Sequence, residues 1–336
     1  MIIILGLKIT YVLTIYKLCP IYLAKPVNRE IIPKEAQACL VLYREMKQQI
    51  KIIFLTLVII LFSFTGCAKK TCIQCGMNSE QIKEQESYWQ NLNYKMLELY
   101  KQGKLKEAVN LGKDSLNFAN KTFGKDSLKA GTSLNNLGEL YRLDKKFGDA
   151  EWHYKKSLEI REKLLGKEHP EVALTLNNLA SVYFAENRFN DAQTTYETAL
   201  KVMEKSPQKD SRSLIALIGN LAELYKSTGK LPKAEAEYKK LLTLREKIAG
   251  KNDLNYAKAL NDLGALYFLE GKYTEAEPVF KNTLTILEEK LGKNHPDLSV
   301  VLENILEVYK KIGDNVKAKA FEERIKGIRT TSQSPS

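Results

Sequence analysis

Three cysteines between positions 67 and 75 are the residues of this 336-residue chain most suited to chemistry. Cys72-Ile73-Gln74-Cys75 has a spacing that occurs in redox motifs and in metal sites. Structural zinc needs four ligands, and the sequence offers neither a second such pair nor a nearby histidine. Haem attachment needs a histidine next, where Gly76 stands. We therefore expect no cofactor and no metal, and either a disulfide between Cys72 and Cys75 or two free thiols; a redox or metal role is the alternative.

Cys67 ends a segment that is typical of a bacterial signal peptide. A short basic stretch begins at Met46, and residues 52–64 carry no charge but are too few to span a membrane comfortably. Phe64-Thr65-Gly66-Cys67 resembles the lipobox of bacterial lipoproteins, with Phe64 in place of the usual Leu. The resemblance implies cleavage before Cys67 and attachment of diacylglycerol to it. An uncleaved membrane anchor and a simple secretory peptide are the alternatives.

Residues 1–45 stand in front of this signal, although a signal peptide normally opens a chain. We expect them to be absent from the native protein, and a genuine first membrane segment is the alternative. Residues 1–66 hold eight Lys or Arg and three Asp or Glu, so without them the formal charge falls from +12 to +7. The remaining charges alternate in sign, as on solvated helices, and no basic stripe with stacking aromatics indicates nucleic-acid binding.

The rest of the sequence contains few residues typical of an active site. It has three histidines, of which His169 and His295 occupy equivalent turns and are expected to start helices, while His153 is isolated. We find no glycine-rich phosphate loop, nucleophile elbow or metal-binding histidine pair. We therefore expect a protein without catalytic activity.

The elements that must position any site come from a 42-residue repeat that fills residues 132–336. Tyrosines recur at this interval at Tyr141, Tyr183, Tyr225, Tyr267 and Tyr309, and alanines at Ala150, Ala192, Ala234, Ala276 and Ala318. One unit of this size cannot bury its own apolar face, so neighbouring units must stack.

Each unit has the pattern of two helices. In the fourth unit an apolar stripe at helical spacing runs from Leu260 to Tyr267, Gly271-Lys272 breaks it, and a second stripe runs from Tyr273 to Leu287. We expect Gly292 to end the second helix as a left-handed cap. Small residues are expected where the two helices approach closely, at Gly138, Ala180, Ala222 and Gly264.

These residues resemble the tetratricopeptide repeat, whose pattern is matched by Leu263-Gly264, Tyr267, Gly271-Lys272-Tyr273, Ala276 and Phe280. The common repeat has 34 residues, and the longer unit here, with about two more turns in its second helix, is similar to that of kinesin light chains. The resemblance implies an all-α, right-handed superhelical solenoid of about six antiparallel helical hairpins.

The expected organisation follows from these patterns. A doubtful leader (1–45) and a signal peptide (46–66) precede a polar tether (67–86) and a degenerate helical repeat (87–131). Five units follow at 132–173, 174–215, 216–257, 258–299 and 300–328, the last being a cap, and residues 329–336 are expected to be a disordered tail.

Stacked hairpins form a concave groove lined by their first helices, and asparagines recur on the exposed side of those helices. The resemblance to kinesin light chains implies that this series contacts an extended peptide, since an amide offers both donors and an acceptor; Asp262 interrupts the series. The alternative is that the asparagines only solvate the helix surface. The candidates are Asn135, Asn136, Asn177, Asn178, Asn220, Asn261 and Asn304.

Basic and aromatic residues alternate on the same side of the first helices, namely Arg142, Phe184, Lys226, Phe268 and Lys310. This pattern favours an acidic ligand segment with apolar anchors.

We therefore expect a protein-interaction scaffold in a bacterial envelope, anchored to the membrane by lipid. Ala68 follows the cysteine instead of an Asp that would favour inner-membrane retention, so the outer membrane is expected where one exists. One alternative is an accessory subunit of an envelope enzyme or secretion complex that uses Cys72 and Cys75. The other is a cytoplasmic adaptor on an uncleaved anchor.

Overall fold

The computed structural model describes residues 77–206 and 211–332, which form twelve α-helices. The expected lipid site Cys67 and the pair Cys72 and Cys75 lie outside these residues. The helices are α3 Ser79–Lys101, α4 Leu105–Thr122, α5 Leu128–Leu143, α6 Phe147–Leu165, α7 Pro170–Ala185, α8 Phe189–Lys205, α9 Ser211–Ser227, α10 Leu231–Ala249, α11 Leu254–Leu269, α12 Tyr273–Leu291, α13 Leu298–Ile312 and α14 Asn315–Ser332.

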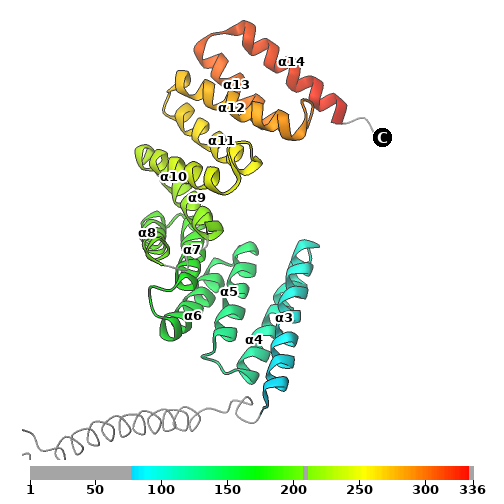
Figure 1. The fold of residues 1–336 in the computed structure, drawn as a ribbon, viewed down its shortest axis with the longest axis vertical. Helices are drawn as coiled ribbons and strands as arrows, with labels where there is room; N and C mark the ends of the chain where they lie inside the picture. The colour runs from blue at the N-terminus through cyan, green and yellow to red at the C-terminus, as the bar shows by residue number, and fades with distance from the viewer. Residues whose placement is uncertain (1–76, 207–210, 333–336) are drawn as a thin grey trace, which may run out of the picture. The chain divides into compact units, whose positions relative to one another are not determined.

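Consecutive helices pack as antiparallel pairs, which gives six hairpins from α3/α4 to α13/α14 (Figure 1). The second helix is the longer one in the central hairpins, as expected: α6, α10 and α12 have 19 residues, whereas α5, α7 and α11 have 16. The expectation of an all-α solenoid of helical hairpins is thus confirmed.

The hairpins α5/α6 and α11/α12 each close on a glycine of the first helix and an aromatic ring of the second. A Cβ atom at Gly138 would lie 2.8 Å from the Tyr154 ring, and one at Gly264 would lie 2.7 Å from the Phe280 ring. These rings are almost fully buried. The small residues expected at close helix contacts are therefore found there, and the backbones approach because no side chain separates them.

The turn inside each hairpin requires a left-handed residue at one repeated position. Glycine supplies it at Gly103, Gly229, Gly271 and Gly313, whereas Lys145 and Asn187 adopt φ of 57° and 60° at the same point of their units. A side chain in this region is strained, least so for Asn. The surrounding packing must therefore impose the turn on Lys145.

The turn between hairpins differs from the expected left-handed cap. Gly292 has φ of 92° but ψ of 155°, and Gly166 and Gly250 are similar. This extended region with positive φ is open essentially to glycine alone. Glycine is therefore required, as expected, but its ψ is extended and does not have the value of a left-handed helical cap.

Neighbouring hairpins are joined by the repeated tyrosines. Tyr309 donates a hydrogen bond to Glu277 of the preceding second helix at 2.7 Å, and Tyr183 and Tyr267 bond in the same way to Glu151 and Glu235. Hydrogen bonds from Lys281 and Tyr309 lower the pKa of the Glu277 carboxyl, so this carboxylate stays ionised at neutral pH.

One unit keeps the tyrosine contact by a different route. Gln193 stands where the other units have the accepting glutamate, and Tyr225 instead donates to Glu197, one turn further along α8, at 2.7 Å. The position of the carboxylate has shifted, but the bond between hairpins is kept.

The expected helix start is found at His169, the N-cap of α7, whereas α13 begins at Leu298, three residues after His295. The backbone N–H groups of Glu171 and Asp297 donate to the Nδ1 atoms of His169 and His295, each at 3.2 Å. Both rings therefore satisfy a backbone donor that a helix terminus leaves free.

Several expected boundaries differ from the helices. α3 begins at Ser79, inside the segment expected to be a tether, because Asn78 and Gln81 form a capping box. At the other end α14 continues to Ser332, beyond the expected start of the tail at residue 329, and its Ile325 and Ile328 side chains are buried. The start assigned to the first unit, residue 132, lies within α5.

The close hairpin contact makes a testable prediction. Gly264→Leu would force a branched side chain against the Phe280 ring and destabilise the protein by about 1–3 kcal/mol, the usual range for overpacking. Urea denaturation followed by circular dichroism measures the change.

Gly148→Ala is the matched control, because a Cβ there meets nothing within 4 Å, and we expect it to be neutral or slightly stabilising. Equal stability of the Gly264→Leu variant and the original chain would contradict the proposed role of this contact.

Candidate peptide-binding surface

The recurring asparagines pair with one another across the first helices of neighbouring hairpins. In each pair the Nδ2 group of one asparagine donates to the Oδ1 atom of an asparagine 43 residues earlier, in the preceding first helix. The four pairs, which we name the asparagine ladder, are Asn136–Asn93 at 2.8 Å, Asn178–Asn135 at 3.2 Å, Asn220–Asn177 at 2.9 Å and Asn304–Asn261 at 2.9 Å.

The asparagines were expected either to contact a peptide or only to solvate the helix surface. The ladder gives them a structural role that leaves capacity for binding a peptide. Each amide carries two donor hydrogens and an oxygen with two lone pairs, and one ladder bond uses only one of these. The ladder side chains are half-buried, so their remaining groups can still meet a ligand. Asn93 in α3 belongs to the ladder but was not among the candidates; it lies 42 residues before Asn135, so the repeat period alone could have revealed it.

The ladder is interrupted between α9 and α11. The pair expected here would join positions 262 and 219, but Asp262 faces a glycine, and no hydrogen bond to the Asp262 side chain is found among the described residues. Burial raises the pKa of the Asp262 carboxyl, although Lys226 and Lys258 lie near enough to oppose the shift. This carboxylate is therefore poorly solvated in a place where other units have a bonded amide.

The basic candidates on this surface have acidic partners within their own helices. Arg142 pairs with Glu139 at 2.7 Å and Lys226 with Glu223 at 2.6 Å, and Lys310 likewise pairs with Glu307. Each glutamate lies three residues before its base, where helix geometry brings the side chains together. These pairs offset the positive charge that favoured an acidic ligand.

The aromatic candidates are half-buried instead of standing free in a groove. Phe184 lies 5.9 Å from Phe189, and Phe268 lies 5.3 Å from Tyr273, measured between ring centroids. Each ring rests on the first residue of the second helix in its own hairpin, and part of each remains exposed.

The chemical character of this surface therefore alternates from one hairpin to the next. Units with an ion pair of Glu and Arg or Lys alternate with units that carry Phe184 or Phe268, where Ser181 and Ala265 replace the glutamate.

A second position, on the long helices, follows the same alternation. Arg161 lies between α5 and α7, where it donates to Thr175 at 2.6 Å and pairs with Glu171 at 3.4 Å. The equivalent residues of the next three units are Met203, Arg245 and Leu287. This side chain determines whether the space between two first helices is polar or apolar.

Among the described residues, no group of three or more His, Cys, Asp or Glu side chains could hold a metal ion. Nor is any helix in these ranges both long and apolar enough to cross a membrane.

Comparison with known proteins identifies the repeat. A family model described as tetratricopeptide repeat matches residues 91–163, 133–205, 213–289 and 258–330, more than half of the chain. The chain belongs to the tetratricopeptide repeat family. Domains of this family bind proteins and peptides and are generally non-catalytic. A comparison with curated proteins gave no match.

Several solved structures share this fold. BtubC (BKLC) from P. vanneervenii is 25% identical, with a TM-score of 0.61, over 69% of this chain and 93% of that one. A putative kinesin light chain from Podosopora anserina is 19% identical, with a TM-score of 0.54, over 61% of this chain and 97% of that one. PilF of Pseudomonas aeruginosa is 16% identical, with a TM-score of 0.51, over 75% and 95%. The latter two show a shared fold alone.

Repair of the interrupted ladder is a stringent test of its geometry. The double change Gly219→Asn and Asp262→Asn should restore the missing pair and stabilise the protein by about 1 kcal/mol, the usual net value of a hydrogen bond. Space exists for the new side chain, because a Cβ at Gly219 meets only Leu241, at 3.9 Å. Thermal and urea denaturation of the single and double variants measure the coupling.

Replacing glycine in a helix raises stability by itself. The coupling between the two changes removes this gain and leaves the contribution of the new hydrogen bond. Strictly additive single effects would show that the two amides do not pair.

Proposed function

We propose that this chain is a non-catalytic scaffold of the bacterial envelope, which holds an extended segment of a partner protein against its first helices. The observation that supports this most is the asparagine ladder. It places a row of half-buried amides on consecutive helices, with donor and acceptor capacity beyond the ladder bonds.

An extended backbone suits this surface because its peptide groups alternate donors and acceptors. Each additional bond contributes about 1 kcal/mol net, so affinity would come from several units acting together. A rigid array also loses little conformational entropy on binding, which favours recognition by many weak contacts.

The proposed location rests on the sequence before the described helices. The basic stretch from Met46, the uncharged residues 52–64 and Cys67 after two small residues support lipid attachment. We infer that the acylated Cys67 holds the helical domain outside the cytoplasm, at the outer membrane where one exists. Ser79, where α3 begins, is 12 residues beyond Cys67. A chain of that length reaches at most about 40 Å, so the scaffold would work close to the membrane.

Capture of partners tests the binding surface. The chain would be expressed from Met46 in a bacterial host, crosslinked and purified beside a variant with Asn178→Ala and Asn220→Ala. We expect the variant to lose partners, because both side chains contribute amides to the central hairpins.

The control carries Asn117→Ala and Asn282→Ala, two exposed asparagines of the second helices α4 and α12, and should capture the same partners as the original chain. Melting temperatures of all three proteins separate lost binding from lost folding. Equal capture by the well-folded asparagine variant would place the interaction elsewhere.

Mass spectrometry of the membrane fraction tests the anchor. The original chain should yield a mature protein that begins at Cys67 and carries the mass of a diacylglycerol. Cys67→Ser should abolish the added mass and leave an unprocessed or soluble chain. A mature protein that starts at any other residue would refute lipid attachment at Cys67.

A further inference from the structure

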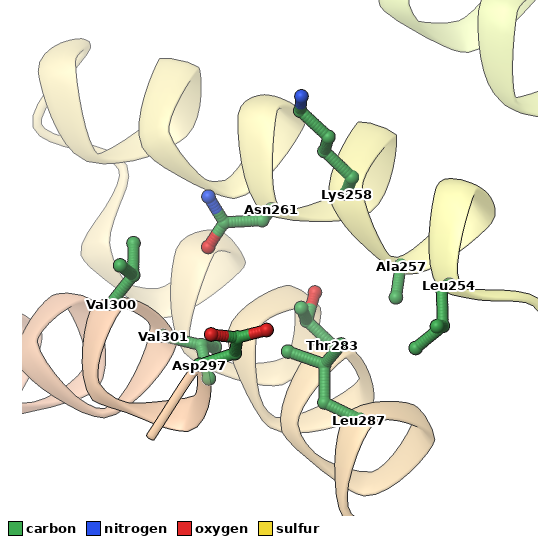
Figure 2. A pocket seen from close by; sticks show the side chains of 9 residues that line it. All are labelled: Leu254, Ala257, Lys258, Asn261, Thr283, Leu287, Asp297, Val300 and Val301. Atoms are coloured by element: carbon green, nitrogen blue, oxygen red, sulfur yellow. The ribbon is translucent and has the colours of Figure 1, made fainter. Parts of the chain in front are cut away.

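A pocket of about 240 Å³ lies between the first helices of the last two hairpins, α11 and α13, with α12 beneath them. Leu254 and Leu287 lie on one side of it and Val300 and Val301 on the other (Figure 2). Leu254 and Val300 are 42% and 61% exposed. The pocket therefore presents an apolar interior with an open apolar rim.

The pocket exists because of one side chain that changes between units. Leu287 stands where Arg161 stands between α5 and α7, and there the guanidinium fills the space and bonds to Thr175 and Glu171. Leucine is shorter and makes no such bonds, so the same space remains open. The residue equivalent to Glu171 is Asp297, at the edge of the pocket.

Two polar oxygen atoms inside the pocket are already engaged. Thr283 donates to the carbonyl oxygen of Val279 at 3.0 Å, and the Oδ1 atom of Asn261 accepts the ladder bond from Asn304. An apolar group would therefore enter without leaving these atoms unpaired. The volume is below the range of pockets for whole small ligands, about 300–1,000 Å³, and it suits a single side chain.

Two charges at the edge differ from the others on this surface. The bases Arg142, Lys226 and Lys310 each have a glutamate partner. Lys258, by contrast, forms no ion pair among the described residues, although it influences the pKa of Asp262. Among the described residues, the Asp297 carboxylate is paired with His295 alone, at 3.7 Å, and this histidine is charged only when protonated. Lys258 projects from α11, whereas Asp297 lies immediately before α13 (Figure 2).

We propose that this pocket receives one apolar side chain of the bound segment, flanked by an acidic residue that faces Lys258 and a basic residue that faces Asp297. The proposal rests on the proposed function and specifies the partner's chemistry. The end of the chain itself is unsuited as occupant, because Thr331 to Ser336 contains no large apolar side chain. Recognition thus depends on charge order around one apolar residue.

Synthetic peptides and methyl-labelled full-length protein in mild detergent test this directly. The probes are acetyl-Gly-Ser-Glu-Leu-Lys-Ser-Gly-amide, its counterpart with Glu and Lys exchanged, and forms with Ala for Leu or with two like charges. One of the mixed-charge peptides should shift the methyl signals of Leu254, Leu287 and Val300. Its Ala form should bind about tenfold more weakly, since it buries less apolar area, and both like-charge forms should also bind more weakly.

Variants of the protein sharpen the result. Leu287→Arg should abolish binding, because an arginine at this position would fill the pocket, as Arg161 fills the equivalent space between α5 and α7. Asp297 is available to pair with the new side chain. Val300→Ala should weaken binding, whereas Leu174→Ala, the equivalent change in α7, should not. Combined Lys258→Glu and Asp297→Lys should exchange the preference between the two mixed-charge peptides, a result that mere destabilisation cannot produce.

Four outcomes would overturn the proposal. The Leu and Ala peptides could bind equally, or the charge reversal could leave the preferred order unchanged. The pocket signals could also shift with protein concentration alone, which would make a second copy the occupant. Methyl signals that shift on other first helices, beside the asparagine ladder, while those of the pocket stay unchanged would refute this proposal but leave the proposed function standing.

Discussion

The contact between a small residue and a buried ring inside the central hairpins is the constraint on which the rest of this structure depends. Gly138 against Tyr154 and Gly264 against Phe280 set how closely two helices approach. That spacing fixes where the second helix presents Glu151 or Glu277, and hence where the next hairpin's tyrosine finds its acceptor. Because the contact recurs every 42 residues, neighbouring first helices come to lie at a distance that one pair of amides can bridge.

The fold could be predicted from the sequence because the repeat encodes local geometry several times over. The helical stripes, the small residues at Gly138 and Gly264 and the helix-starting histidines all depend on contacts within one unit or its immediate neighbour. Boundaries were less predictable, since Asn78 and Gln81 start α3 through side-chain hydrogen bonds that a hydrophobic pattern does not reveal. Gly292 shows a similar limit: the requirement for glycine was foreseen, but not the value of ψ.

The candidate surface was only partly predictable, because its properties depend on what lies across from each residue. The asparagine positions followed from the period, but their mutual hydrogen bonds required the stagger of 43 residues between adjacent helices. The basic residues suggested an acidic ligand until Glu139 and Glu223 were seen beside them. The pocket was not predicted from the sequence, because Leu287 fits the apolar stripe of its helix. Its significance follows only from comparison with Arg161 at the equivalent position.

The alternation of charged and aromatic hairpins has a consequence for how such a chain can change length. Removal of a single 42-residue unit would place two ion-paired hairpins, or two phenylalanines, side by side. Removal or insertion of 84 residues would preserve the order of Arg142, Phe184, Lys226, Phe268 and Lys310. The pattern of this surface thus repeats with every pair of hairpins, twice the size of the structural repeat, so only a change of length by whole pairs would keep its order.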